Sequence, residues 1–176
     1  MKKALRQRAA KIKLLLLDVD GVLTDGSLYY GAEGEALKRF YVRDGSAIVW
    51  LMRSGIEVAI ISGNVSPQVA ARARGLGIKT VIQGALKKLP AFEEFLSTRP
   101  DLTAEEIAFM GDDLIDLPVL RRVGLALAPA DAYPEVQIEV HWVSEAKGGC
   151  GAVREAGELL LKAQGKWEEA TKLYRE

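Results

Sequence analysis

The chain has 176 residues, with 24 Lys plus Arg and 24 Asp plus Glu, so its formal net charge is zero. This length predicts one domain with a core large enough to fold alone. The balanced charge argues against nucleic acid as the main partner, because proteins that bind it usually carry a basic excess. A membrane is not expected as a partner either, since no apolar stretch approaches the length of a membrane span.

The start of the chain predicts a solvated first helix, because it is rich in basic residues: Lys2, Lys3, Arg6, Arg8, Lys11 and Lys13. The apolar run that follows ends at Asp18 and is too short for the hydrophobic part of a signal peptide. The only cysteine, Cys150, predicts a reducing, cytoplasmic setting. The only histidine, His141, lies in a strand-like stretch where a structural or surface role is expected. Any chemistry must therefore rest on carboxylates, hydroxyls and lysines.

Short apolar runs alternate with helical segments along most of the chain. The runs predict strands at 13–17, 57–61, 80–82, 107–110 and 125–127. Helix starts are predicted where Asp44 caps 45–53, at Ser66-Pro67, at Lys87-Lys88 and at the capping box 103–106. This alternation predicts an α/β fold with a Rossmann-like parallel sheet covered by helices on both faces.

Two segments break the alternation. Residues 28–30 and 37–42 flank the turn 31–34 and predict a β-hairpin, whose aromatic side chains would pack on the domain or on another subunit. Near the end, 152–164 predicts an amphipathic helix that Gly165 stops. Residues 166–176 then predict a short, charged, mobile tail.

The strongest chemical signal is the run Asp18-Val19-Asp20-Gly21, directly after the first strand. Two carboxylates at the carboxyl end of a parallel strand lie where α/β sheets bind ligands. Two such charges about 4 Å apart repel by about 4 kcal/mol at an effective dielectric of 20. A bound cation or a shared proton would relieve this repulsion.

A second group of acids follows the strand 107–110, namely Asp112, Asp113 and Asp116. Asp113 alone could be a helix N-cap, but that explains only one of the three. Oxygen ligands without histidine or cysteine favour Mg²⁺ over Zn²⁺.

Two weaker signals complete a site for phosphoryl transfer. Ser62-Gly63-Asn64 follows the strand 57–61, and the pair Lys87-Lys88 begins a helix. Asp18 can act as nucleophile and Asp20 can protonate the leaving group and then activate water. Mg²⁺ can bridge Asp18, Asp112 and the phosphate, while Ser62 and one of the lysines hold the phosphate.

At these residues the chain resembles the haloacid dehalogenase superfamily, whose four motifs occur in order as DVDGVLT, ISG, the lysine and GDDLID. The resemblance implies that Asp18 is nucleophile and metal ligand, and that Asp20 is the acid–base and binds metal through its carbonyl. It implies Asp112 as the third metal ligand, with Asp113, Asp116, Gly63 and Asn64 in support. An acid at position 20 favours a phosphatase over a dehalogenase. With only the hairpin as an insertion, the chain resembles members without a cap domain, which often oligomerise.

Further motifs are similar to the family of 3-deoxy-D-manno-octulosonate 8-phosphate (KDO 8-phosphate) phosphatases: QG-x-x-x-KL, GDDLIDLPVL, PADA and GG-x-GAVRE. This resemblance implies Lys88 as the catalytic lysine, a cytoplasmic homotetramer and a role in lipopolysaccharide biosynthesis. It implies contacts with the sugar phosphate from Thr24, Gly63, Lys88 and, in the tail, Lys166. The chain departs from the family at Asn64, where some members have arginine, and at Cys150, where many do.

Three alternatives to this function stay open. Phosphatases that act on nine-carbon sialic acid or KDN 9-phosphates share most of the motifs. A receiver-type signalling domain also carries an aspartyl-phosphate, but its phosphorylated Asp follows the third strand, where this chain has Gln83-Gly84. A non-catalytic subunit would leave all four filled motif positions idle.

Overall fold

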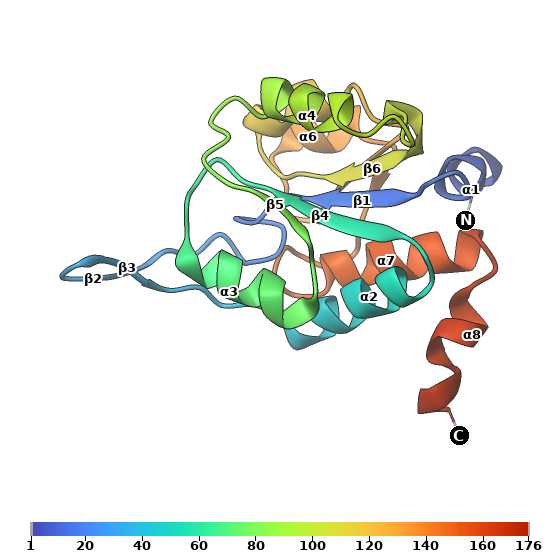
Figure 1. Ribbon diagram of the computed structural model, residues 1–176, viewed down its shortest axis with the longest axis horizontal. Coiled ribbons are helices and arrows are strands. Elements are labelled where there is room, and N and C mark those ends of the chain that lie inside the picture. The colour runs from blue at the N-terminus through green and yellow to red at the C-terminus, as the bar shows by residue number, and fades with distance from the viewer. Residues whose placement is uncertain (1, 176) are drawn as a thin grey trace.

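A computed structural model of the chain describes residues 2–175 (Figure 1). It contains a six-stranded sheet and a separate two-stranded hairpin. The strands of the large sheet are β1 (Leu14–Leu17), β4 (Glu57–Ile61), β5 (Thr80–Ile82), β6 (Ile107–Met110), β7 (Leu125–Ala128) and β8 (Trp142–Val143). Three of the five predicted strands, 57–61, 80–82 and 107–110, match β4, β5 and β6 fully, and the other two differ from β1 and β7 by one residue at one end.

All neighbouring strands of the large sheet run parallel, in the order β5-β4-β1-β6-β7-β8. Numbered along the large sheet alone, this order is 3-2-1-4-5-6, the Rossmann arrangement that the alternation predicts. A receiver domain has the order 2-1-3-4-5 instead, so the topology argues against that alternative. The order reverses between β1 and β6, and their carboxyl ends therefore form the point where such sheets bind ligands.

Helices cover both faces of the sheet (Figure 1). They are α1 (Lys3–Ala9), α2 (Val42–Arg53), α3 (Pro67–Leu76), α4 (Lys88–Ser97), α5 (Leu117–Leu120), α6 (Pro134–Glu139), α7 (Ala152–Ala163) and α8 (Trp167–Thr171). Strand β1 is buried on both faces: Leu15 and Leu17 join the core beside α2 and α7, while Leu14 and Leu16 join the core beside α4 and α5. A run of four leucines suits such a strand, because neither face meets water.

The hairpin, β2 (Tyr29–Gly31) and β3 (Gly34–Leu37), projects from the body of the molecule (Figure 1). The prediction that its second arm extends to residue 42 is wrong, because β3 ends at Leu37 and α2 begins at Val42. Within residues 2–175 this hairpin is the only element between β1 and α2, and α3 is the only one between β4 and β5. The described chain therefore has no room for a cap domain at either place.

Asp44 was predicted to cap α2, and this prediction is wrong. The residue lies inside the first turn of that helix and is buried. Its carboxylate instead accepts the N–H of Arg154, 2.7 Å away, in the first turn of α7. Burial raises the pKa of Asp44 to about 6, against the backbone hydrogen bonds from Arg154 and Gly151. The side chain thus caps a helix that lies 110 residues further along the chain.

Within the described residues the tail forms α8 and a short helix, Lys172–Tyr174, which pack against the body, while its mobility stays a prediction. The ring of Trp50 lies 5.9 Å from that of Trp167 and 5.4 Å from that of Tyr174. The guanidinium of Arg154 stacks over Trp50 at 4.2 Å. Aromatic and cation–π contacts of this kind explain why a charged sequence is held in place.

Candidate active site

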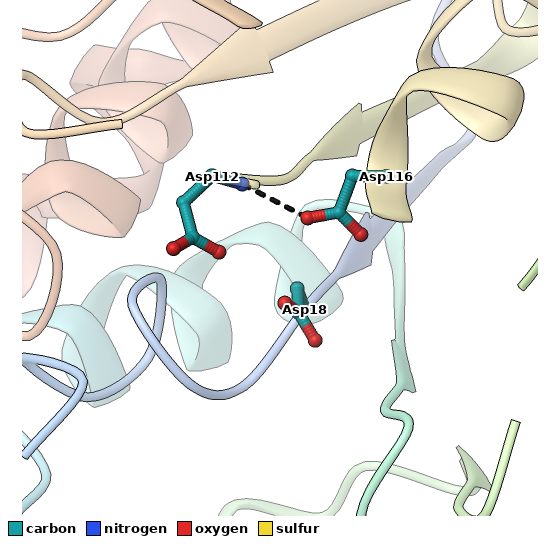
Figure 2. Close-up of side chains that lie close together, drawn as sticks. All are labelled: Asp18, Asp112 and Asp116. Atoms are coloured by element: carbon teal, nitrogen blue, oxygen red, sulfur yellow. Dashed lines mark hydrogen bonds between the residues drawn. The ribbon is translucent and has the colours of Figure 1, made fainter. Parts of the chain in front are cut away.

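Three carboxylates meet where β1 and β6 end. Asp18 follows β1, and Asp112 and Asp116 come from the loop and turn after β6 (Figure 2). One oxygen of each lies within 4.8 Å of the others. The sheet topology, which sets β1 beside β6 in parallel, brings together groups that are almost a hundred residues apart.

Lys88, the first residue of α4, neutralises part of this acidic cluster. Its ammonium lies 2.8 Å from Asp18 Oδ1 and 2.5 Å from Asp116 Oδ1, and the side chain is 1% exposed. Burial alone would lower the pKa of Lys88, but the two carboxylates outweigh it and raise the pKa. Lys88 is therefore the lysine of the site, as the resemblance implies, while Lys87 is exposed.

Asp116 is fully committed to protein partners, and Asp112 is not. Besides Lys88, Asp116 accepts the N–H groups of Asp112 and Asp113 at 3.0 and 3.3 Å. Asp112 Oδ1 is buried and has no hydrogen-bond partner. A buried carboxylate oxygen left without a donor is costly, so its position beside Asp18 suits a cation.

These surroundings raise the pKa of two of the acids. Burial and the nearby Asp18 and Asp116 raise the pKa of Asp112 to about 8. Burial raises the pKa of Asp18 to about 6, against the attraction of Lys88. Both carboxyl groups therefore keep their protons more strongly than usual when no metal is bound. Mg²⁺ prefers oxygen ligands, and its charge would hold Asp18 and Asp112 in the ionised form. Asp18 and Asp112, with the carbonyl of Asp20, would be its protein ligands.

We expect Mg²⁺ to stabilise the protein more at about pH 8.5 than at about pH 6. Without metal, the folded state keeps protons on Asp18 and Asp112 that the unfolded chain, with carboxyl pKa values near about 4, has released. Stability therefore falls as pH rises from about 4 to about 8, and Mg²⁺ binding removes this loss by displacing the protons. Thermal unfolding with Mg²⁺ or with a chelator measures the shift at each pH.

The matched control for this prediction is Asp112→Asn. This variant should show a small Mg²⁺ shift at both pH values, because the ligand with the larger pKa change is gone. An equal Mg²⁺ shift at both pH values in the original chain would contradict the assignment.

Asp20 is not part of the three-acid cluster, and each of its two carboxylate oxygens contacts a different side chain. Lys38 Nζ lies 2.6 Å from Oδ1, and Asn64 Nδ2 donates to Oδ2 at 2.9 Å. Burial would lower the pKa of Lys38, but hydrogen bonds to Asp20 and Glu35 raise it overall. Neither Lys38 nor Glu35 was predicted as a site residue, because a Glu–Lys pair three residues apart in a hairpin has the pattern of solvated side chains.

The remaining predicted contacts with phosphate have local structural partners. Ser62 is buried at the end of β4, and its Oγ accepts the N–H of Asn64 at 3.2 Å. Thr24 is buried too, and its hydroxyl closes a turn by accepting the N–H of Gly26 at 3.2 Å. Asp113 is exposed and accepts the N–H of Leu114 at 2.7 Å, so it is the N-cap that its position allowed.

Glycines let the loops of the site approach one another closely. Gly21 has φ of +84°, and a Cβ there would lie 2.0 Å from Asp112 Oδ2. A Cβ on Gly148 would lie 1.8 Å from the carbonyl oxygen of Gly21, and Gly149 donates its N–H to the carbonyl of Val22 at 2.9 Å. The segment before α7 therefore braces the loop that carries Asp18 and Asp20.

Lys166 is not brought to this site within the chain. It lines a hollow with Lys13, Gly55 and Thr103, which precede β1, β4 and β6. That hollow is at the amino-terminal edge of the sheet, and α8 lies on the same side of the molecule (Figure 1). Within one chain α7 carries the tail away from the strand ends, and the contact of Lys166 with the sugar phosphate stays a prediction.

Several known proteins are similar to this chain over most of its length. A KDO 8-phosphate phosphatase KdsC of Yersinia pestis is 50% identical over 167 residues, which are 95% of this chain and 89% of the relative. KdsC of Escherichia coli strain K12 is 49% identical over 163 residues, or 93% and 86% of the two chains. A Moraxella catarrhalis structure, described as this phosphatase with magnesium ion, phosphate ion and KDO, gives a TM-score of 0.94 at 37% identity and covers 99% of both chains. No protein-family model matches the chain.

The fold and the acidic site thus define a phosphoric monoester hydrolase of the haloacid dehalogenase superfamily, whose cofactor is Mg²⁺. Within that superfamily, the chain belongs to the family of KDO 8-phosphate phosphatases. The resemblance drawn from the motifs is confirmed at both levels.

Proposed function

We propose that this enzyme hydrolyses KDO 8-phosphate to KDO and inorganic phosphate through an aspartyl-phosphate on Asp18. The observation that carries the proposal is the group of buried Asp18, half-buried Asp112 and buried Lys88 at the sheet switch point. The relatives named for this substrate support the choice of sugar.

Two displacements at phosphorus complete the reaction. An Asp18 oxygen forms a bond to phosphorus while the bond from phosphorus to the sugar oxygen breaks, and Asp20 gives its proton to that oxygen. Asp20 then takes a proton from water, which attacks the phosphorus and releases phosphate and Asp18. Lys88 holds one oxygen of Asp18 and thus orients the nucleophile.

The other groups neutralise charge and hold the phosphate. Bound Mg²⁺ would supply positive charge at the phosphoryl oxygens and relieve the repulsion between Asp18 and Asp112. Ser62, Gly63 and Lys88 would hold the phosphate at the ends of β4 and the start of α4, and Thr24 would support the loop beneath it.

The substrate is tested by phosphate release from eight- and nine-carbon sugar-acid phosphates, each with Mg²⁺, with Ca²⁺ and after chelation. We expect KDO 8-phosphate to give the highest kcat/KM, in preference to the sialic acid and KDN 9-phosphates. Chelation should stop turnover. Ca²⁺ should replace Mg²⁺ poorly, since it takes more ligands at longer distances.

Two outcomes would contradict this proposal. A higher kcat/KM for a nine-carbon phosphate would move the substrate assignment to that class. Undiminished turnover in excess chelator after dialysis would remove the metal from the mechanism.

The enzyme would work as a cytoplasmic homotetramer in which hairpins pack between subunits. Large apolar side chains are exposed on and beside the hairpin, among them Leu28, Tyr30 and Val42, which are 57%, 71% and 72% exposed. No helix within residues 2–175 is long and apolar enough to cross a membrane. A neighbour's hairpin would cover these side chains and wall the site.

Light scattering tests the assembly. The chain should have four times the monomer mass, and Leu28→Glu with Tyr30→Glu should reduce it, because charge would enter an apolar contact. Ile138→Glu is the control, since Ile138 is 82% exposed on α6, away from the hairpin. A monomeric chain, or equal effects of both changes, would contradict the hairpin interface.

A further inference from the structure

The side chain of Lys38 is a buried cation, and the phosphate-binding groups described above do not include it. Its side chain is 1% exposed although it follows the exposed hairpin, in the link between β3 and α2. The ammonium lies 2.6 Å from Asp20 Oδ1 and 3.1 Å from Glu35 Oε2. Burying an ammonium is costly unless carboxylates surround it, and here two do so.

The carboxyl group of Asp20, the proposed acid–base residue, has a fixed orientation because both of its oxygens accept hydrogen bonds. Lys38 binds Oδ1 of Asp20, and Asn64 donates to Oδ2 from the turn after β4. The carboxyl group cannot rotate without losing one of these bonds. Each oxygen keeps a second lone-pair direction, so the group can still exchange a proton with the substrate.

The partners of Asp20 are themselves tied together. Glu35 Oε1 lies 3.3 Å from Ser66 Oγ, and Gln68 Nε2 donates to the carbonyl of Ala36 at 3.3 Å. These bonds fasten the base of the hairpin to the start of α3, which begins three residues after Asn64. Lys38 and Asn64 therefore approach Asp20 from one connected frame.

We propose that Lys38, oriented by Glu35, is a positioning residue that holds the Asp20 carboxyl in line with the leaving oxygen. The inference rests on the proposed role of Asp20 as the acid. Proton transfer needs heavy-atom distances of about 2.6–3.2 Å, and small misplacements cost large factors in rate. The hairpin therefore serves catalysis within its own subunit.

The test compares leaving groups, using kcat/KM, which reports the steps up to formation of the aspartyl-phosphate. An alkyl phosphate such as a sugar phosphate needs the proton, and a nitrophenyl phosphate hardly does. For Lys38→Met we expect kcat/KM to fall about 10- to 100-fold with the sugar phosphate, a part of the roughly 10²- to 10⁴-fold that acid catalysis contributes. With nitrophenyl phosphate it should fall by less than about 3-fold.

A double-variant cycle separates positioning from a general structural effect. In an Asp20→Asn background, Lys38→Met should cause little further loss, because residues that act as one unit are not additive. Glu35→Gln should show the same dependence on the leaving group to a smaller degree. Glu33→Gln, in the exposed turn of the same hairpin, is the matched control and should leave both rates unchanged.

Two outcomes would overturn the inference: equal losses on both kinds of substrate, or a full additional loss in the Asp20→Asn background. If Lys38→Met does not fold, Glu35→Gln carries the same comparison, since it leaves the ammonium in place. A graded series of aryl and alkyl phosphates makes the test independent of the sugar. Failure of the proposed substrate would show separately, as absent turnover of KDO 8-phosphate by the unaltered chain.

Discussion

Asp18→Asn is expected to lower turnover by at least about 10⁴-fold while the chain still folds. An amide is a poor nucleophile and a poorer metal ligand, so the aspartyl-phosphate cannot form. Phosphate release from the sugar phosphate and from nitrophenyl phosphate should fall together, because both need this nucleophile. The measurement is steady-state phosphate release by the purified variant.

The stability of this variant provides an independent check. Because burial raises the pKa of Asp18 to about 6, its charge at neutral pH is a cost to the folded metal-free chain. Asp18→Asn should therefore unfold at the same or a higher temperature without metal, and Lys88 keeps Asp116 as its partner. Asp113→Asn is the control, an exposed acid of the same site that should retain most activity. Near-normal turnover by Asp18→Asn would mean that the nucleophile is wrongly assigned.

Lys88→Ala is expected to damage both activity and stability. It leaves Asp18 and Asp116 buried without their shared cation, and breaking a buried ion pair on one side costs about 3–5 kcal/mol. Loss of a positive group at the phosphate should lower kcat about 10²- to 10³-fold. Denaturant unfolding and phosphate release measure the two effects, and added Mg²⁺ should restore part of the stability by neutralising the acids.

Lys87→Ala supplies the comparison for Lys88→Ala, because Lys87 is the exposed neighbour. It should change stability by less than about 0.5 kcal/mol, as expected for surface positions, and leave kcat almost unchanged. If the order of the two effects were reversed, the lysine of the site would be misplaced by one residue.

The fold and the acid cluster could be predicted because their signals are local. Each strand is a short apolar run, and each acid group follows such a run directly. Parallel pairing then brings the carboxyl ends of β1 and β6 together without any further information. Lys88 needed the resemblance as well, since two adjacent lysines look alike until one of them is buried.

The features that the sequence did not reveal depend on distant partners. Asp44 is a residue type typical of an N-cap and stands just before a helical segment, but the N–H that its carboxylate accepts is that of Arg154. The charged sequence of the tail suggests mobility, but the ring of Trp167 packs against that of Trp50 on α2. Lys38 has the pattern of a solvated hairpin residue, and only the fold shows Asp20 beside it. In each case a tertiary contact outweighs a local preference.

The bracing of the loop after β1 by Gly148 and Gly149 has a consequence during synthesis. A ribosome delivers the nucleophile loop early, but the segment that presses on it emerges after more than a hundred further residues. Asp44 likewise waits for the first turn of α7 before its carboxylate finds its donor. Such late, long-range closure is slow compared with local helix formation. We therefore expect a nascent chain cut before residue 148 to hold the acids on their strands without binding Mg²⁺ firmly, so that catalytic competence comes only with about the last sixth of the polypeptide.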